Sequence, residues 1–214
     1  MNKKWECYVA DENEVEKIAK KYDINKILAT ILVNRKLTDE ETVQKFLNPT
    51  RKDFHNPYLM PDMEKAVSRI IKAIENHEKI MIYGDYDADG ITSITVLKKF
   101  LNERNIPVET YIPNRLDEGY GLNKNAIQSI YNLGYRLMIT VDCGISGIEE
   151  IDFANQLGIE TIITDHHEPS DVLPNAYAVI DAKRKDNTYP FNQLAGVGVV
   201  FKVIQAISIK LGLE

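Results

Sequence analysis

Three aspartates stand at alternate positions in the segment IMIYGDYDADGITS, residues 80–93. Asp85, Asp87 and Asp89 follow an apolar run, and a glycine comes directly after the third of them. Two unit charges about 4 Å apart repel by roughly 1 kcal/mol in water and by about 4 kcal/mol at an effective dielectric of 20. A fold that gathers three such groups must either raise their pKa values or bind a cation. The spacing therefore favours a cation site in this segment.

Two further segments place polar side chains directly after an apolar run. The run LMITV is followed by Asp142, and the run TIIT is followed by Asp165, His166 and His167. Carboxylate oxygens combined with one or two imidazoles suit Mn²⁺ or Mg²⁺ better than they suit a structural zinc ion. Since adjacent histidines rarely point the same way, we expect His166 to bind metal and His167 to face the substrate.

A site built from these groups has a definite chemistry. Two divalent ions lower the pKa of a bound water and hold both the attacking and the leaving oxygen of a phosphoester. The first segment also resembles the start of an EF-hand, but Val96 stands where that loop needs glutamate, and the segment follows a strand. Asp142 or Asp165 alone would equally fit a turn or a helix cap. Three such motifs at successive strand ends favour a metal-dependent phosphodiesterase site.

The elements that must position these groups alternate in type from residue 79 onward. Apolar segments predict strands at 79–85, 107–113, 136–142, 160–166 and 176–181. Amphipathic segments predict helices at 90–104, 123–134, 147–158 and 196–212. This alternation predicts an α/β fold with a mostly parallel sheet flanked by helices. Ligands of such sheets bind beyond the carboxyl ends of the strands, so the three motifs should meet at one edge.

The region before residue 79 predicts helices and a linker. Helical patterns cover residues 11–22, 24–35 and 38–47, and Thr38 is the expected N-cap of the third helix. A segment rich in proline and asparagine follows, and then an amphipathic helix over residues 62–77. The apolar face of that last helix should comprise Met63, Val67, Ile70, Ile71 and Ile74. We therefore predict a helical N-terminal segment with a linker, residues 1–78, and a catalytic domain, residues 79–214.

Composition limits the classes of protein that fit. Apolar residues make up 44% of the 214 residues and charged residues 27%, which is ordinary for a globular protein. The formal net charge of -6 argues against a general polyanion binder, so a nucleic-acid role needs bound cations or a local basic patch. Two cysteines are too few for a disulfide scaffold, and we expect Cys143 to be buried. With no signal peptide and no apolar run near the roughly 20 residues that span a bilayer, we expect a cytoplasmic protein without membrane association.

Four other features each have two readings. Arg115 follows a strand and would bind a phosphate, and Tyr120 would stack on a base; alternatively, the segment is a solvated loop with a packed tyrosine. The amides of Gly196 and Gly198 at a helix start would hold a phosphate, or the glycines serve a tight turn with close packing. The basic run at 183–185 is either a substrate patch or an ordinary charged surface.

Together these motifs resemble the DHH phosphoesterase superfamily, and within it the RecJ single-strand-specific exonucleases. GDYDADGITS is similar to the first motif of the family, VDCGIS to the second and TDHHEP to the third. The segments YIPNRLDEGYGL and LAGVGVVFK also resemble RecJ proteins. Superfamily members that act on small substrates usually begin the first motif with histidine, where this chain has Asp85. The similarity covers nearly the whole chain.

The resemblance implies a 5′-to-3′ exonuclease that acts on single-stranded DNA in repair and recombination and uses a pair of Mn²⁺ or Mg²⁺ ions. It further implies that Asp165 supports the metal cluster, that His167 contacts the scissile phosphate, and that Arg115 contacts a substrate phosphate. The residues that the resemblance assigns to the metal ions are Asp85, Asp87, Asp89, Asp142 and His166.

The chain also departs from the family pattern. RecJ proteins usually read AVVNPK where this chain reads AVIDAK, so Asp181 and Ala182 replace an Asn-Pro pair. The fourth motif of the family, with a further aspartate ligand, comes after the last helix, so we expect residues 1–214 alone to have weak or no nuclease activity. Two alternatives stay open: hydrolysis of short oligonucleotides or cyclic dinucleotides, and a metal-binding module without catalysis.

Overall fold

The structure is a computed structural model that describes residues 6–213, and the chain divides into two compact units between Phe54 and His55. The first unit has a small apolar core formed by Val15, Ile18, Ala29, Leu32 and Val43. Its elements are α1 (Glu12–Tyr22), α2 (Lys26–Asn34), α3 (Glu40–Leu47) and the 3₁₀ turn η1 (Arg51–Asp53).

The three helices predicted in this unit are confirmed, with one correction. The N-cap of α3 is Asp39 and not Thr38, because the Asp39 carboxylate accepts a hydrogen bond from the Thr42 amide at 3.0 Å. The segment predicted as a linker contains η1 and a second 3₁₀ turn, η2 (Pro57–Leu59), which belongs to the second unit.

The second unit is an α/β fold, as predicted, and its sheet is entirely parallel. The five strands lie in the order β2-β1-β3-β4-β5. The strands are β1 (Ile80–Gly84), β2 (Val108–Tyr111), β3 (Leu137–Val141), β4 (Glu160–Thr164) and β5 (Ala178–Ile180). The helices are α4 (Met63–Glu75), α5 (Ala88–Asn102), α6 (Lys124–Asn132), α7 (Ile148–Gln156) and α8 (Gly196–Lys210).

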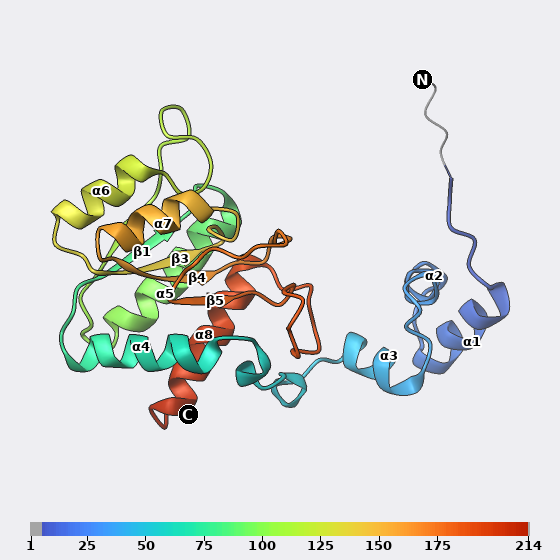
Figure 1. Cartoon of the computed structure of the whole chain (residues 1–214). Helices are drawn as coiled ribbons and strands as arrows, with labels where there is room; N and C mark the ends of the chain where they lie inside the picture. The colour runs from blue at the N-terminus through green and yellow to red at the C-terminus, as the bar shows by residue number, and fades with distance from the viewer. Residues whose placement is uncertain (1–5, 214) are drawn as a thin grey trace, which may run out of the picture. The chain divides into compact units, whose positions relative to one another are not determined.

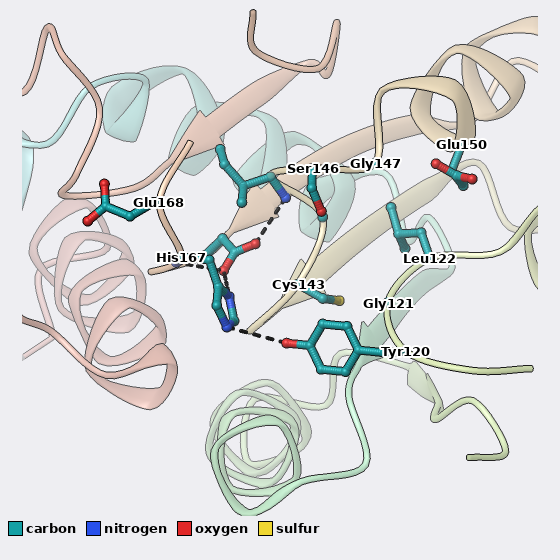
Figure 2. A pocket seen from close by; sticks show the side chains of 12 residues that line it. Tyr120, Gly121, Leu122, Cys143, Ser146, Gly147, Glu150, His167 and Glu168 are labelled. Atoms are coloured by element: carbon teal, nitrogen blue, oxygen red, sulfur yellow. Dashed lines mark hydrogen bonds and ion pairs between the residues drawn. The ribbon is translucent and has the colours of Figure 1, made fainter. Parts of the chain in front are cut away.

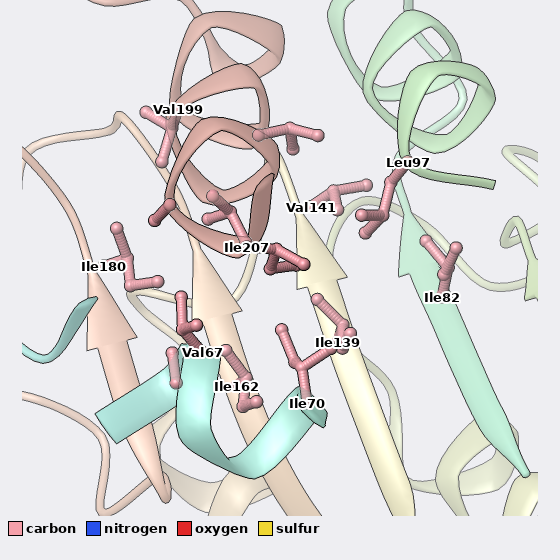
Figure 3. Close-up of a cluster of buried hydrophobic side chains, with 14 of the residues drawn as sticks. Val67, Ile70, Ile82, Leu97, Ile139, Val141, Ile162, Ile180, Val199 and Ile207 are labelled. Carbon is pink, nitrogen blue, oxygen red and sulfur yellow. The ribbon is translucent and has the colours of Figure 1, made fainter. Parts of the chain in front are cut away.

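Helices cover both faces of this sheet (Figure 1). Helices α4, α5 and α8 pack on one face, and α6 and α7 pack on the other. Along β1, Ile80 and Ile82 face the first set of helices, while Met81 and Tyr83 face the second, as the alternation of a strand requires. Figure 3 shows the aliphatic side chains of the strands, α4, α5 and α8 that fill the larger core. Coverage of both faces explains why the central strands β1 and β3 are buried along their whole length and have apolar sequences.

Helix α4 belongs to the second unit, because its predicted apolar face packs on the sheet. Met63, Val67 and Ile70 are buried, and Ile71 and Ile74 pack half-buried against the same core. The compact units divide between residues 54 and 55. This division does not test the domain boundary predicted between residues 78 and 79, which stays a prediction. Among residues 6–213, no helix is both long and apolar enough to cross a bilayer.

A buried arginine ties α4 to the amino ends of two strands. Arg69 is 6% exposed, and its guanidinium donates to the Glu160 carboxylate at 2.6 Å and to the Glu78 carboxylate at 2.7 Å. Glu160 begins β4, and Glu78 lies in the turn before β1. These ion pairs therefore hold the helix at the end of the sheet opposite the strand ends that carry the predicted site.

We expect Arg69→Met to lower the free energy of unfolding by about 1–3 kcal/mol, measured by urea unfolding. The loss of unfolding free energy should be smaller than for a fully buried ion pair. The side chains of Glu78 and Glu160 are 30% and 46% exposed, so water can hydrate both carboxylates once the arginine is gone. The control is Lys124→Met, which breaks an exposed pair with Glu149 and should change stability by less than about 0.5 kcal/mol. Equal effects of the two variants would show that the Arg69 pairs do not stabilise the fold.

Candidate metal centre

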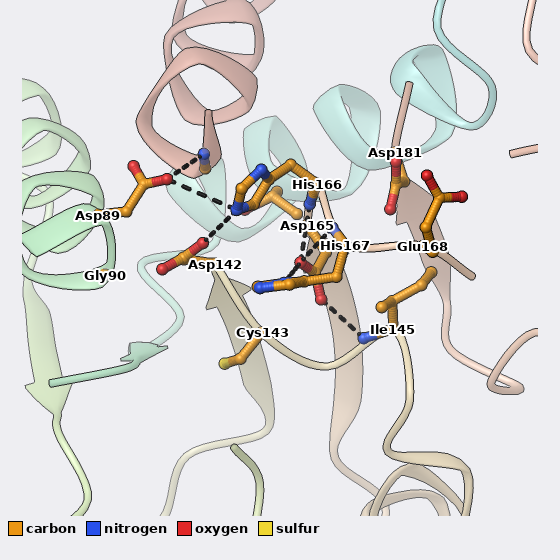
Figure 4. A network of polar contacts seen from close by, with 12 residues as sticks. Asp89, Gly90, Asp142, Cys143, Ile145, Asp165, His166, His167, Glu168 and Asp181 are labelled. Carbon is orange, nitrogen blue, oxygen red and sulfur yellow. Dashed lines mark hydrogen bonds and ion pairs between the residues drawn. The ribbon is translucent and has the colours of Figure 1, made fainter. Parts of the chain in front are cut away.

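The carboxyl ends of three neighbouring strands deliver the predicted site residues to one edge of the sheet. Asp85 follows β1, Asp142 follows β3 and Asp165 follows β4. These strands pair directly, β1 with β3 and β3 with β4, so their ends lie side by side. Figure 4 shows the side chains that gather there. The predicted convergence of the motifs is therefore present in the fold, while the role of each side chain in metal binding stays a prediction.

The centre of the cluster is formed by Asp142 and His166. The Asp142 Oδ1 atom and the His166 Nε2 atom are 3.0 Å apart, and the Asp89 Oδ2 atom lies 3.6 Å from the same nitrogen. One ligand atom from each of Asp142, His166 and His167 falls within 4.8 Å of the others. Side chains from the first turn of α5 and from the β3–α7 and β4–β5 connections thus share one small space.

Asp142 is held in an uncommon backbone conformation. Its φ angle is +59°, in the left-handed region, which costs a residue other than glycine roughly 1–3 kcal/mol. The Asp142 amide donates to the carbonyl of Thr164 at 2.9 Å, which fixes the end of β3 against β4. Burial raises the pKa of the Asp142 carboxyl to about 7, and the charges of Asp89 and Asp87 add to this effect. Such strain and charge at one residue are typical of a functional site.

Asp85 and Asp87 are fixed by backbone amides of their own loop. Asp85 is fully buried, and its Oδ1 atom accepts from the amide of Tyr86 at 2.6 Å. Burial raises the pKa of Asp85. Asp87 is the N-cap of α5, because its Oδ1 atom accepts from the amides of Asp89 and Gly90, both at 2.9 Å. These bonds, the Gly90 bond foremost, lower the pKa of Asp87 overall. The helix predicted to start at residue 90 thus starts at Ala88.

Asp89 has a partner that the sequence analysis did not predict. Its carboxylate accepts hydrogen bonds from the amides of Gly196 at 2.7 Å and Val197 at 2.9 Å, at the start of α8. The amino terminus of a helix favours a carboxylate, because its free amides and its dipole are positive. Two groups predicted to bind ligands, the Asp89 carboxylate and the Gly196 amide, therefore bind each other. Phosphate binding by Gly196 and Gly198 stays a prediction.

Gly196 also lies directly against Asp142. A Cβ atom added at Gly196 would fall 2.5 Å from the Asp142 Oδ1 atom and 2.8 Å from its Cγ atom. Real Cβ atoms do not approach other atoms so closely, so this position requires glycine. In the structure Gly196 therefore serves close packing at a helix start, which is the second of the two roles considered for Gly196 and Gly198. A Cβ atom at Gly198 would instead make its nearest contact with Leu194, at 3.3 Å.

Asp165 orients His167 rather than joining the central cluster. Its Oδ1 atom lies 2.7 Å from His167 Nδ1 and accepts from the amide of His166 at 2.7 Å, while its Oδ2 atom accepts from the amide of Ile145 at 2.9 Å. Burial alone would raise the pKa of Asp165, but the side-chain bond from His167 and the amides of Ile145 and His167 lower it overall. The same hydrogen bond to Asp165 raises the pKa of His167. His167 Nδ1 is therefore the donor of this pair, and Nε2 is turned away from Asp165.

We expect Asp165→Asn to lower kcat by about 100-fold, because a neutral amide no longer stabilises a proton on His167 and no longer fixes the orientation of its ring. The affinity for Mn²⁺, measured by titration calorimetry, should fall by about tenfold at most, the low end of the range for a group that supports ligands without binding the ion. The matched control is Asp171→Asn at an exposed site. Full activity of the Asp165 variant would refute the orienting role.

A cavity of about 350 Å³ opens beside His167. Figure 2 shows its walls, which include Tyr120, Cys143, Ile145 and Glu150 as well as His167. The Tyr120 hydroxyl lies 3.3 Å from His167 Nε2, so the ring of Tyr120 borders both the cavity and the histidine. Cys143 is buried, as predicted. The cavity continues directly from the strand ends, and its walls mix apolar and polar groups.

The remaining predicted substrate groups lie in different surroundings. Arg115 is exposed, and its guanidinium carbon sits 5.4 Å from the centre of the Tyr86 ring. In the basic run at 183–185, Arg184 is 9% exposed by side chain and pairs with Asp62 at 2.8 Å. Lys183 and Lys185 also lie close to carboxylates. The run is therefore a set of ion pairs, one of them structural, and not a free basic patch.

One buried carboxylate, Asp181, was not among the predicted site residues. Asp181 follows β5 and is fully buried; its Oδ1 atom accepts from the amide of Lys183 at 2.7 Å, and its Oδ2 atom has no hydrogen-bond partner within the described residues. Burial raises the pKa of Asp181 to about 7. The sequence carried a signal for it, since it follows an apolar strand in the same way as Asp85, Asp142 and Asp165.

The donor set fits a hard divalent cation. Asp85 Oδ2 is buried and accepts no hydrogen bond from the described residues. Asp142 Oδ1 is also buried, and it has an ion-pair contact with His166 Nε2 at 3.0 Å but no hydrogen bond within the described residues. Unpartnered buried carboxylate oxygens are costly, and a cation relieves that cost. Oxygen ligands with one imidazole, from His166, match Mn²⁺ or Mg²⁺. The residues present therefore suit such ions.

Comparison with known sequences gives one family and a set of relatives. The model of the DHH family, N-terminal domain, matches residues 79–213. The single-stranded-DNA-specific exonuclease RecJ of Bacillus subtilis strain 168 is 44% identical over 204 residues, which is 95% of this chain and 26% of that protein. RecJ of Escherichia coli strain K12 is 40% identical over 148 residues, 68% of this chain and 25% of that protein. The chain spans about a quarter of the length of these relatives.

Solved structures with the same fold include two of RecJ. A crystal structure of exonuclease RecJ bound to manganese matches with a TM-score of 0.66 and 32% identity, over 72% of this chain and 39% of that chain. RecJ from Thermus thermophilus in complex with Mn²⁺ matches with a TM-score of 0.73 and 22% identity, over 96% of this chain and 29% of that chain. The second match, at its lower identity, is a likeness of fold alone.

Proposed function

This chain belongs to the DHH family, and on that premise we propose that it forms the metal-binding part of a phosphodiesterase that degrades single-stranded DNA from the 5′ end. The observation that carries the proposal is the 3.0 Å contact between Asp142 Oδ1 and His166 Nε2, which lies beside the end of β1 where the buried Asp85 Oδ2 atom has no hydrogen bond within the described residues. Similarity to RecJ exonucleases, one of them solved with manganese, supports the choice of substrate and of Mn²⁺ or Mg²⁺.

Each side chain has a defined part in this proposal. The residues that would hold the ions are Asp85, Asp87, Asp89, Asp142 and His166. Asp89 lies 3.6 Å from His166 Nε2 and also accepts hydrogen bonds from two amides at the start of α8. The bound ions supply a water of lowered pKa and positive charge for the phosphate oxygens. Asp165 accepts a hydrogen bond from His167 Nδ1 and so holds the ring with Nε2 toward Tyr120 and the cavity. A protonated His167, favoured by its raised pKa, donates a hydrogen bond to a phosphate oxygen.

The proposed function also implies a binding partner, a cellular process and a compartment. Single-stranded DNA is the partner, and the divalent ions offset part of the acidic charge that would otherwise repel it. We propose roles in DNA repair and recombination in the cytoplasm. Two unpaired cysteines, exposed Cys7 and buried Cys143, fit a reducing compartment.

The test uses the full-length protein, freed of metal with a chelator and then given Mn²⁺ or Mg²⁺. We expect mononucleotide release from the 5′ end of a labelled 40-nucleotide single strand, with little release from a blunt duplex of the same sequence. The matched control is the protein kept in chelator. A protein that binds Mn²⁺ but releases no nucleotide from any strand would support the alternative of a metal-binding module.

The second candidate substrate class is short oligonucleotides or cyclic dinucleotides, and the cavity of about 350 Å³ beside His167 is the observation that favours it. The same assay separates the two classes when strand length is varied from two to 40 nucleotides. Rates that rise with length support the exonuclease proposal. Rates that peak at two to five nucleotides, with cleavage of a cyclic dinucleotide, would replace it.

A further inference from the structure

The loop between β2 and α6, residues 112–123, carries two of the predicted substrate groups. Arg115 and Tyr120 are both exposed on it. Gly119 and Gly121 have positive φ angles, and an added Cβ atom would meet nothing within 4 Å at either position. The backbone at both glycines is therefore free of close packing, so hydrogen bonds contribute to holding this part of the loop, together with the edge contacts of the Tyr120 ring with Tyr86 and His167.

Those hydrogen bonds converge on Glu118. Its Oε2 atom accepts from the amide of Asn114 at 2.7 Å, and its own amide donates to the carbonyl of Asn114 at 2.8 Å, which closes a turn around Arg115. Its Oε1 atom accepts from the Tyr111 hydroxyl at 2.6 Å and from Asn123 Nδ2 at 3.1 Å. One carboxylate thus joins the end of β2, the turn of the loop and the residue that caps α6.

A buried tyrosine of β1 continues this network into the sheet. Tyr83 is fully buried, its ring stacks on that of Tyr111 with centroids 5.2 Å apart, and its hydroxyl donates to the carbonyl of Gly121 at 2.9 Å. Asn123 Nδ2 lies 3.3 Å from the Tyr83 hydroxyl and completes the ring of contacts. The loop is therefore anchored to the strand whose end carries Asp85.

The anchored loop faces the strand ends. The Tyr120 hydroxyl lies 3.3 Å from His167 Nε2, and Arg115 stands over the ring of Tyr86, the neighbour of Asp85 in the chain. We propose that Glu118 is a positioning residue that fixes this loop so that Arg115 and Tyr120 contact the DNA strand beside the metal centre. The identity of the ligand rests on the function proposed above, whereas the fixing of the loop does not.

The first test measures the loop without metal or DNA. Trypsin cleaves after Arg115, so the rate of cleavage at the Arg115–Leu116 bond reports how often the turn opens. In the full-length protein, Glu118→Ala should raise this rate by about tenfold or more and Glu118→Gln by about threefold, because charge-assisted hydrogen bonds are lost. Each rate is normalised to a peptide of the same variant sequence, and Asp117→Asn is the matched control. An unchanged rate in both Glu118 variants would overturn the proposal.

The second test measures the substrate. In both Glu118 variants we expect KM for single-stranded DNA to rise by about tenfold, while kcat stays within about threefold and the Kd for Mn²⁺ does not change. The Asp117→Asn control should keep the wild-type KM. A loosened loop with an unchanged KM would overturn the positioning role. Absence of nuclease activity in the wild type would instead refute the proposed function, and the tryptic result would still decide whether Glu118 fixes the loop.

Discussion

Asp142→Asn in the full-length protein should lower the rate of DNA cleavage by at least about a thousandfold and weaken Mn²⁺ binding by at least about a hundredfold. The reason is the central place of Asp142, whose Oδ1 atom lies 3.0 Å from His166 Nε2 and lacks a normal hydrogen bond within the described residues. The amide has the same shape but no negative charge, so the fold should persist. Single-turnover cleavage of a 5′-labelled strand and titration calorimetry measure the two effects.

The same variant should also change thermal stability, which should stay equal or rise where activity and Mn²⁺ affinity fall. Without metal, Asp142→Asn should melt at a temperature equal to or higher than that of the wild type, because a buried carboxylate beside Asp87 and Asp89 is replaced by a neutral group. Circular dichroism in the presence of chelator measures this. The control is Asp152→Asn at an exposed position on α7, which should leave cleavage and metal binding unchanged. Cleavage by Asp142→Asn within tenfold of the wild-type rate would exclude a metal centre built around this residue.

Gly196→Ala is expected to lower kcat by at least about a hundredfold and the free energy of unfolding by about 1–3 kcal/mol. A Cβ atom at this position would fall 2.5 Å from the Asp142 Oδ1 atom, so either the Asp142 carboxylate or the start of α8 must move. Movement of α8 would also break the two hydrogen bonds to Asp89. Cleavage kinetics and urea unfolding of the full-length protein report the two losses.

Gly198→Ala, two residues along the same helix, is the matched control for this variant. Its Cβ atom would meet only the side chain of Leu194, at 3.3 Å and beyond, and that side chain can shift. Its stability should stay within about 0.5 kcal/mol of the wild type or rise, since alanine favours a helix over glycine. If the two alanine variants behave alike, the contact between Gly196 and Asp142 does not matter to the site.

Much of the fold followed from patterns in the sequence that have a single physical solution. The unbroken apolar runs at residues 80–84 and 137–141 require a sheet covered on both faces, and the intervening helices require parallel strands. Parallel strands bring their carboxyl ends to one edge, which is why Asp85, Asp142 and Asp165 were expected to be neighbours. The register that aligns Gly84 with Val141 gives them that arrangement.

Contacts between distant segments did not follow from the sequence. Asp89 and Gly196 are 107 residues apart, and no local pattern indicates that the amide of one binds the carboxylate of the other. The hydrogen bonds of Glu118 were also missed, because its charge looks like that of any exposed loop residue until Tyr111 and Asn123 are placed beside it. Hydrogen-bond partners depend on angles and distances that apolar periodicity does not encode.

The pairing of Asp89 with the start of α8 has a consequence for the order in which the protein matures. Asp87 and Asp89 each accept two backbone amide hydrogen bonds, so part of the repulsion in the cluster is already offset by the polypeptide itself. A newly synthesised chain can therefore close this region before any ion arrives. On the function proposed above, scarcity of the divalent ion would then leave a folded and inactive protein that recovers when the ion returns.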